Sequence, residues 1–322
     1  MTYLVVLVLL VVAELVYFRM AERFGIVDRP NRRSSHTQVT LRGGGIVFLV
    51  GAWLYPLFSG FSHPWFLAGV TLVGVVSFAD DVRSLPDSVR LAVQCAAMML
   101  AFHDWGVLSL RYWWAVIPVL VLCVGIVNAW NFMDGINGIT GGYSLAVLVP
   151  LLFVNREARF IDGDFLVVAI LSVLTFCFFN FRREAKCFAG DVGSVVIAFI
   201  IVFALGKLIL LTGDFTCIMF LAVYGVDSVL TIVHRIMLHE KLGEAHRKHL
   251  YQLMANELKL PHTVVATTYA LVQLVISFGL VYLPINHWLY AGVVLTVLCL
   301  AYMLFMKKYY HLHEEYLTGI KK

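Results

Sequence analysis

The chain has 322 residues, of which 61% are hydrophobic and 14% charged, and its mean hydropathy is +0.87. This composition excludes a water-soluble globule and predicts an integral membrane protein. The net charge of +4 reflects basic residues gathered at one membrane face rather than affinity for nucleic acid, so we expect no nucleic-acid partner.

Apolar stretches follow one another along almost the whole chain. Because a spanning helix needs roughly 20 mostly apolar residues, we predict about eleven spans (ten to eleven). The apolar runs are continuous rather than alternating, which excludes a closed barrel. The predicted fold is an all-α, polytopic membrane helical bundle in which residues 1–322 form a single domain. The spans are expected near residues 2–20, 44–60, 64–80, 89–103, 112–128, 139–154, 164–181, 192–211, 215–233, 263–283 and 287–306.

Two features of these spans bear on their placement. The second and fourth are short, so a tilted or partly interfacial position stays open for them. The first has no basic residues before it and no small-residue cleavage site after it, so we expect a retained helix rather than a signal peptide.

The positions of the basic residues predict the orientation. With the N-terminus outside and the C-terminus cytoplasmic, all but four of the 24 Lys and Arg residues lie on the cytoplasmic side; the four are Arg111, Arg156, Arg159 and Lys207. The positive-inside rule favours this orientation. It brings every polar motif to the cytoplasmic face, in loops at about 21–43, 79–90, 128–140, 182–192 and 234–262.

The first motif is the acidic pair Asp80-Asp81 at the inner end of the third span. Neighbouring helix positions point about 100° apart, so the two carboxylates face different groups. Adjacent carboxylates repel each other, and a divalent cation that also binds phosphate would relieve that repulsion. The alternative is a solvated helix end, and the pair alone does not decide between them.

The second motif lies at the inner end of the fifth span. Asn128 and Asn131 are three residues apart and share a helix face, and Asp134 follows before the chain turns at Gly135. Two amides and an acid then point toward one cavity, beside a glycine-rich segment that can approach an anion. Helix capping with close packing at glycine is the alternative, but it does not require both asparagines.

The third motif is Gly190-Asp191-Val192-Gly193-Ser194, at the start of the eighth span. Asp191 could cap that helix or hold a cation beside its N-terminus. Capping does not explain glycines on both sides, which indicate close approach of a ligand or of another backbone.

The largest predicted cytoplasmic loop is basic and rich in histidine, and it contains His246, Arg247 and His249. Such a loop beside acids and a cation suits a substrate that contains a diphosphate. The alternative is an ordinary positive-inside loop.

Six motifs in this order resemble the polyprenyl-phosphate N-acetylhexosamine-1-phosphate transferase family (glycosyltransferase family 4 type), and the resemblance covers nearly the whole chain. Besides the motifs above, the first loop carries Arg33 and His36 within Pro30-Asn31-Arg32-Arg33-Ser34-Ser35-His36, followed by Arg42-Gly43-Gly44-Gly45. Asp227-Ser228 and Arg235 look like the family's Asp-Thr and arginine element. The ending His246-Arg247-Lys248-His249-Leu250-Tyr251-Gln252 looks most like the bacterial O-antigen-initiating branch that uses UDP-FucNAc or UDP-QuiNAc.

The resemblance implies transfer of a sugar 1-phosphate, from an N-acetylated hexosamine or 6-deoxyhexosamine, from a UDP-sugar to undecaprenyl phosphate with release of UMP. It implies Mg²⁺ as cofactor, with Mn²⁺ as a substitute, and membrane lipids as surroundings. The location implied is the bacterial inner membrane, with the active site on the cytoplasmic face and a role in O-antigen or cell-envelope synthesis. A homodimer stays open.

The resemblance also implies roles for individual residues. Asp191 is the expected main magnesium ligand, with support from Asp81, and Asp80 and Asp81 orient or deprotonate the lipid phosphate. The expected substrate-binding residues are Asn128, Asn131, Asp134, His246, Arg247, His249, Arg33 and His36. Asp227 and Arg235 are expected behind these residues, supporting them.

The chain departs from the family pattern at two places: the first carries no carboxylate role over to this chain, and the second bears on sugar or nucleotide selectivity. Asn137 stands where many relatives have an aspartate, and Tyr251 and Gln252 stand where others have histidines. Two other classes of protein fit the sequence less well. A transporter or flippase of lipid-linked sugars would line a path through the bilayer with polar residues, whereas this chain gathers them at one face. A phosphotransferase of the CDP-alcohol type needs an Asp-Gly-x-x-Ala-Arg segment, which is absent from the sequence.

Overall fold

The computed structural model describes residues 2–30, 35, 38–108, 113–241 and 246–319. Most of this chain is helical, because a continuous apolar run can satisfy its backbone groups within a membrane as a helix. The elements are α1 (Thr2–Phe24), β1 (Val27–Asp28), β2 (Thr40–Leu41), α2 (Ile46–Ser59), α3 (Pro64–Val82), α4 (Asp87–Asp104), α5 (Trp113–Met133), α6 (Ile139–Ala158), α7 (Gly163–Asn180), α8 (Gly190–Thr212), η1 (Phe215–Leu221), α9 (Ala222–Met237), α10 (Leu250–Gln252), η2 (Leu253–Glu257), α11 (His262–Tyr282) and α12 (His287–Thr318).

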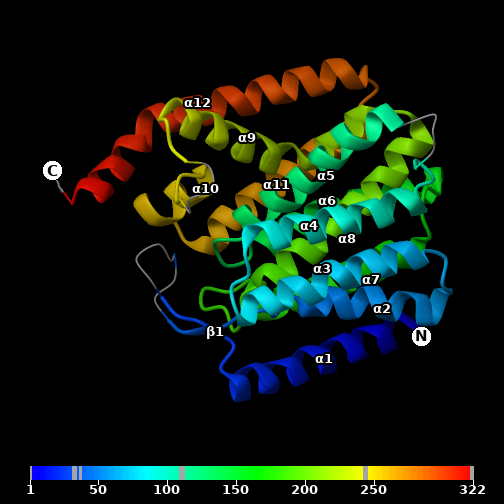
Figure 1. Cartoon of the computed structure of the whole chain (residues 1–322). Coiled ribbons are helices and arrows are strands. Elements are labelled where there is room, and N and C mark those ends of the chain that lie inside the picture. The colour runs from blue at the N-terminus through cyan, green and yellow to red at the C-terminus, as the bar shows by residue number, and fades with distance from the viewer. Residues whose placement is uncertain (1, 31–34, 36–37, 109–112, 242–245, 320–322) are drawn as a thin grey trace.

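The predicted all-α, polytopic membrane fold is confirmed. In the described part of the chain, 9 helical segments are long and apolar enough to cross a membrane, with η1 and α9 forming one of them. The two segments predicted to be short, α2 and α4, are not among these nine. The start of α1 and the end of α12 lie at opposite ends of the bundle (Figure 1), in agreement with termini on opposite sides. Which end faces the cytoplasm stays a prediction.

Helix α8 forms the centre of the bundle. It packs against α2, α3, α5 and α6, and every residue from Val192 to Leu205 is buried. A helix enclosed on all sides must be apolar all round, as this one is. Helices α1 and α12 lie on opposite flanks (Figure 1) and expose many large apolar side chains. Asp191 therefore lies at one end of the protein core.

Two segments distant in sequence run side by side at the start of α8. β1 pairs antiparallel with β2, and Leu41 of β2 forms a parallel bridge to Cys187. The Gly44 and Gly45 amides then donate to the Phe188 and Ala189 carbonyls at 2.8 and 3.0 Å. Glycine is required here: a Cβ atom on Gly45 would lie 2.2 Å from the Gly193 Cα atom. The two glycine-rich motifs of the sequence thus allow α2 and α8 to start in contact.

Lys207 is a charged residue of α8 at the end of the bundle opposite the acidic motifs, and it pairs with Asp104 there. Its Nζ atom lies 3.2 Å from Asp104 Oδ1, and the His63 Nδ1 atom lies 2.8 Å from the same oxygen. These three side chains come from α8, the end of α4 and the residue before α3, so they tie three segments together far from the acidic motifs.

Candidate active site

The adjacent acids of α3 face different partners, as their helix positions predict. Asp81 accepts hydrogen bonds from the backbone amides of Asp191 and Val192 at 2.9 and 3.0 Å, and from Arg42 Nε at 2.6 Å. Its side chain has no exposed surface. Asp81 therefore caps α8 from a neighbouring helix, and the Asp191 carboxylate is left for another task. The side chain that caps α8 is therefore that of Asp81 and not that of Asp191.

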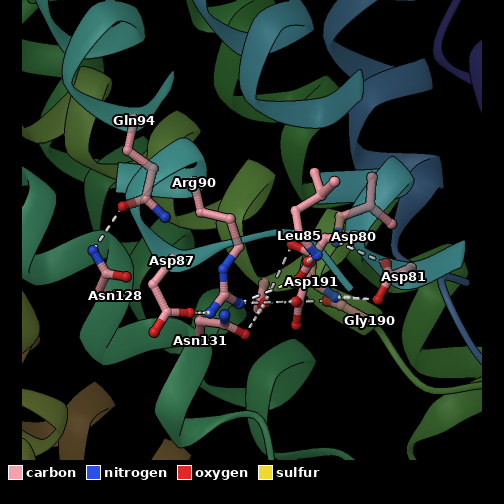
Figure 2. Close-up of polar contacts among 12 residues, drawn as sticks. Asp80, Asp81, Leu85, Asp87, Arg90, Gln94, Asn128, Asn131, Gly190 and Asp191 are labelled. Atoms are coloured by element: carbon pink, nitrogen blue, oxygen red, sulfur yellow. Dashed lines mark hydrogen bonds and ion pairs between the residues drawn. The ribbon is translucent and has the colours of Figure 1, made fainter. Parts of the chain in front are cut away.

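Asp80 points to the other side and meets Asp191 (Figure 2). The two carboxyl groups lie in hydrogen-bond contact with each other. Asp80 also accepts from the Leu85 amide at 2.5 Å and lies 3.2 Å from Arg90 Nη1. Because two carboxylates in contact repel each other, they require a shared proton or a cation between them.

Two arginines flank Asp191 on opposite sides. Arg42 Nη2 lies 3.5 Å from Asp191 Oδ1, and Arg90 Nη1 lies 3.5 Å from Asp191 Oδ2. Burial alone would lower the pKa of Arg42, but Asp81 and Asp191 outweigh it and raise that pKa, so the guanidinium stays charged. When Asp80, Asp81 and Asp191 are all ionised, their three carboxylates carry one more charge than these two guanidinium groups, and this excess favours an added cation.

Two cavities meet at Asp191. The first, which we call the amphipathic cavity, has a volume of about 550 Å³ and lies among α3, α4, α5, α8 and the His246–Gln252 segment. The second, the polar cavity, has a volume of about 360 Å³ and is lined by the first loop, the Asp134–Asn137 turn and the start of α8. Asn131, Asp191 and Gln252 line both cavities. A group bound at Asp191 can thus be approached from two sides.

The second motif divides between these cavities. Asn128 lines the amphipathic cavity, where its amide donates to Gln94 Oε1 at 2.6 Å (Figure 2). Asn131 lines both cavities, and its Oδ1 accepts from Ser194 Oγ at 2.9 Å. Asp134 lines the polar cavity and accepts from Thr140 Oγ1 at 2.6 Å. Burial raises the pKa of Asp134 to about 6.

The histidine motif forms one wall of the amphipathic cavity. His249 Nδ1 lies 3.3 Å from Asp227 Oδ1, and in the described part of the chain its buried Nε2 atom has no partner. His246 Nδ1 is likewise buried without a partner among the described residues. Burial and the nearby His249 lower the pKa of His246 to about 3, so it is neutral at physiological pH. Both rings therefore line the cavity as hydrogen-bonding groups.

Asp227 is buried behind His249 and bonds several other groups. It also accepts from the Leu250 amide at 3.0 Å and from Tyr269 Oη at 2.7 Å. Because its partners act as donors, an ionised carboxylate is the form that satisfies them. The carboxylate fixes the ring of His249 through its Nδ1 atom.

The other predicted site residues lie farther away or outside the described residues. The Arg247 guanidinium binds Glu257 Oε1 at 3.0 Å, packs over Tyr316, and lines neither cavity. Arg235 bonds Glu240 at 3.2 Å and the Lys241 carbonyl at 2.6 Å, so it supports the loop. Arg33 and His36 lie outside the described residues, and their roles stay predictions.

A magnesium ion would find two facing carboxylates here. Among the described residues, no group of three or more His, Cys, Asp or Glu side chains is arranged to hold a metal ion. Magnesium, however, commonly uses one or two carboxylates and takes its other ligands from water and substrate phosphates. The contact between Asp80 and Asp191 fits that need. Asp81, the other predicted ligand, already has both oxygens engaged.

Sequence reasoning gave no site role to Arg90 or Gln94, which line the amphipathic cavity together with Gln252. A signal for Arg90 was present: it lies three residues after Asp87 at the start of α4, and it pairs with that acid as well as with Asp80. Gln94 follows Arg90 by one helical turn and so shares its face. Gln252 was noted only as a departure from the family's histidines, and its place in the cavity depends on the fold of the loop.

An acid and arginine cluster at one end of a bundle of apolar helices, with a cavity on either side, defines an integral membrane protein built to bind an anionic group. Sequence comparison shows which proteins this chain is similar to. Residues 63–209 match the sequence model of glycosyl transferase family 4, which confirms the resemblance seen in the motifs. This segment includes α3 to α7 and most of α8, and so contains Asp80, Asp81 and Asp191.

The relatives agree with this assignment. The chain is 28% identical over 258 residues to a probable undecaprenyl-phosphate N-acetylglucosaminyl 1-phosphate transferase of Bacillus subtilis, covering 74% of this chain and 72% of the relative. It is 25% identical to the undecaprenyl-phosphate alpha-N-acetylglucosaminyl 1-phosphate transferase of Escherichia coli O157:H7, covering 89% and 84%. A phospho-N-acetylmuramoyl-pentapeptide-transferase of Thermotoga maritima is 27% identical, covering 59% and 67%. The first two relatives are, by name, undecaprenyl-phosphate N-acetylglucosaminyl 1-phosphate transferases.

Proposed function

We propose that this protein transfers a sugar 1-phosphate from a UDP-sugar to undecaprenyl phosphate, releasing UMP and forming a lipid diphosphate sugar. The phosphate of the lipid attacks the phosphorus next to the sugar, and UMP leaves. Both reactants are anions, so the site must hold them together and stabilise the charge that develops on the transferred group.

The observation that supports this best is the position of Asp191. It lies on the boundary shared by a polar cavity and an amphipathic cavity, with an arginine on each side. A transfer between a water-soluble donor and a lipid acceptor needs two approaches to one reacting atom. The polar cavity suits the nucleotide diphosphate, and the amphipathic cavity suits a phosphate attached to an apolar chain.

The residues divide the work as follows. Asp80 and Asp191 would hold Mg²⁺, which would supply Lewis-acid stabilisation of the charge on the transferred group. Arg42 and Arg90 hold phosphate oxygens on either side, and Asp81 keeps Arg42 and the start of α8 in place. Asn128, Asn131 and Asp134 form the floor of the two cavities, and His246 and His249 donate or accept hydrogen bonds at the wall.

A third cavity supports a binding site for the lipid tail. It has a volume of about 510 Å³, is lined largely by apolar side chains, and lies farther along α4, α5 and α8, the helices that also line the amphipathic cavity. A polyprenyl chain whose phosphate is at Asp191 would follow these helices toward that cavity, so the lipid reacts without leaving the bilayer.

The finer identity is also proposed here. The Tyr251 and Gln252 ending supports an N-acetylated 6-deoxyhexosamine donor such as UDP-FucNAc or UDP-QuiNAc, and a role at the start of O-antigen synthesis. The gathering of basic residues supports a site on the cytoplasmic face of a bacterial inner membrane. Undecaprenyl phosphate and membrane lipids are then the partners.

A flippase of lipid-linked sugars is less well supported. Transport needs a polar path between the two ends of the bundle. In the described chain, α8 is apolar and buried from Val195 to Leu205, and the charges at the far end bind one another.

Turnover of purified protein tests the proposal directly. Protein in detergent with Mg²⁺, undecaprenyl phosphate and a panel of UDP-N-acetyl sugars should release UMP with at least one of them. EDTA should stop the release, and Mg²⁺ or Mn²⁺ should restore it. Release that does not depend on the lipid, or no release with any sugar from folded protein, would contradict the proposal.

Asp227→Asn should lower kcat by roughly 10- to 100-fold, because the carboxamide weakens a charge-assisted hydrogen bond that fixes His249. The measurement is UMP release at saturating substrates. Tyr269→Phe is the matched comparison, since it removes one donor from the same carboxylate but leaves its charge. We expect a smaller loss there. An Asp227→Asn protein with wild-type kcat would show that His249 needs no such support.

A further inference from the structure

The first helix contributes two buried polar side chains to the region behind the acidic site. Glu14 and Tyr17 lie three residues apart in α1, so they share one face. Glu14 is 0% exposed and Tyr17 is 6% exposed. Both contact the paired segments that precede α2 and α8, and the family match, which begins at residue 63, does not include them.

Tyr17 holds the backbone of Arg42. Its hydroxyl group donates to the Arg42 carbonyl oxygen at 2.5 Å, and its ring packs edge-on against Phe78 of α3. Gly43 leaves room for this contact: it has φ +83, and a Cβ atom there would lie 2.4 Å from the Tyr17 hydroxyl oxygen. The glycine after Arg42 thus serves the hydrogen bond from α1 to Arg42.

Glu14 contacts the second segment. The Cys187 thiol donates to Glu14 Oε1 at 3.6 Å. Burial and the adjacent Glu14 raise the pKa of Cys187 well above its usual value, so it stays a thiol and can act as that donor. Gly44 lies against this pair, since a Cβ atom there would be 2.5 Å from Cys187 Sγ. One turn of α1 therefore supports both segments.

The Tyr17 hydrogen bond is made to Arg42, which belongs to the proposed active site. The carbonyl that Tyr17 binds belongs to Arg42, whose guanidinium lies 2.6 Å from Asp81 and 3.5 Å from Asp191. Arg42 lines the polar cavity but not the amphipathic cavity. A shift of the Arg42 backbone would therefore change the side of the site assigned to the donor.

We propose that Tyr17 is a positioning residue for the transfer reaction, acting through Arg42 on binding and orientation of the donor diphosphate. This rests on the proposed function. The effect is specific in direction: losing the Tyr17 hydroxyl should impair use of the UDP-sugar and leave use of the lipid acceptor unchanged.

The test compares Tyr17→Phe with Tyr55→Phe. Tyr55 is a matched control because it is also buried, at 1% exposed, and its hydroxyl also donates to an oxygen acceptor, Asp162 Oδ2 at 3.2 Å, away from both cavities. For Tyr17→Phe we expect kcat/KM for the UDP-sugar to fall about tenfold, the effect of one lost hydrogen bond, with KM for undecaprenyl phosphate unchanged. For Tyr55→Phe we expect both parameters to stay within about twofold of wild type.

A double-mutant cycle tests whether Tyr17 acts through Arg42. If it does, Tyr17→Phe with Arg42→Lys should lose no more activity than Arg42→Lys alone, because two residues on one route do not add. If the losses of the two single variants instead multiply in the double variant, the two residues act independently and the proposal is overturned. Equal effects of Tyr17→Phe and Tyr55→Phe, or equal losses for donor and acceptor, would also overturn it. Wild-type protein that releases no UMP would instead refute the proposed function itself.

Discussion

Asp191→Asn should reduce UMP release on the order of 10³-fold while leaving the protein folded. Asp191 lies between both cavities, faces Asp80, and is approached by Arg42 and Arg90, so its charge is aimed at the place where the phosphoryl group must sit. The measurement is kcat at saturating UDP-sugar, undecaprenyl phosphate and Mg²⁺.

The same substitution should leave the thermal midpoint unchanged or raise it. Asparagine removes the repulsion between the Asp80 and Asp191 carboxyl groups, so the folded state loses an unfavourable contact while activity is lost. Asp164→Asn is the matched control, because Asp164 accepts bonds from Tyr3 and Ser59 and lines neither cavity. Its turnover should stay near wild type. Normal turnover of the Asp191→Asn protein would remove the central residue from the proposal.

Gly45→Ala should both destabilise the protein and abolish most of its activity. A Cβ atom at this position would lie 2.2 Å from the Gly193 Cα atom and 2.9 Å from the Ala189 carbonyl oxygen. These neighbours are backbone atoms that cannot rotate away, so α2 and α8 must separate. We expect a cost of about 2 to 3 kcal/mol in the free energy of unfolding. When α2 and α8 separate, the first turn of α8, which carries Asp191, must also move.

Thermal unfolding in detergent and UMP release measure these two effects. Gly292→Ala in α12 is the matched control, since a Cβ atom there meets nothing within 4 Å. Gly193→Ala approaches the same contact from the other helix, with a Cβ atom 2.7 Å from the Gly45 Cα atom, and should have a similar effect. A Gly45→Ala protein with the stability and turnover of Gly292→Ala would show that the close contact is not needed.

The fold was predictable to a large extent because a membrane imposes simple rules. Length and continuity of apolar residues predicted helices, and the two spans expected to be short are the two that fall outside the membrane-crossing set. The end of α12 was not anticipated: it runs to Thr318, beyond the apolar stretch, and its Tyr316 ring packs against Arg247 of the histidine loop. Hydropathy carries no signal for such an extension, since its support comes from tertiary contacts.

The residues that form the site were predictable from the sequence, whereas the role of each residue was less predictable. Asp80, Asp191, Asn131 and His249 were all named from sequence, because polar residues beside membrane helices are costly and so point to function. The division of roles between the adjacent acids was not predictable. Asp81 binds amides more than 100 positions away, and only the folded chain brings that helix end to it.

The sequence by itself determined that this is a bundle of membrane helices with acids, amides and histidines at helix ends, and the order of its motifs was enough to show the resemblance to glycosyl transferase family 4. Only the tertiary structure decided that Asp191, rather than Asp81, is open to both cavities, and that Arg42 and Arg90 flank it. The physical reason is range: hydropathy and helix periodicity act between neighbours in sequence, whereas the electrostatics of this site depends on charges from separate segments held within about 4 Å of one another.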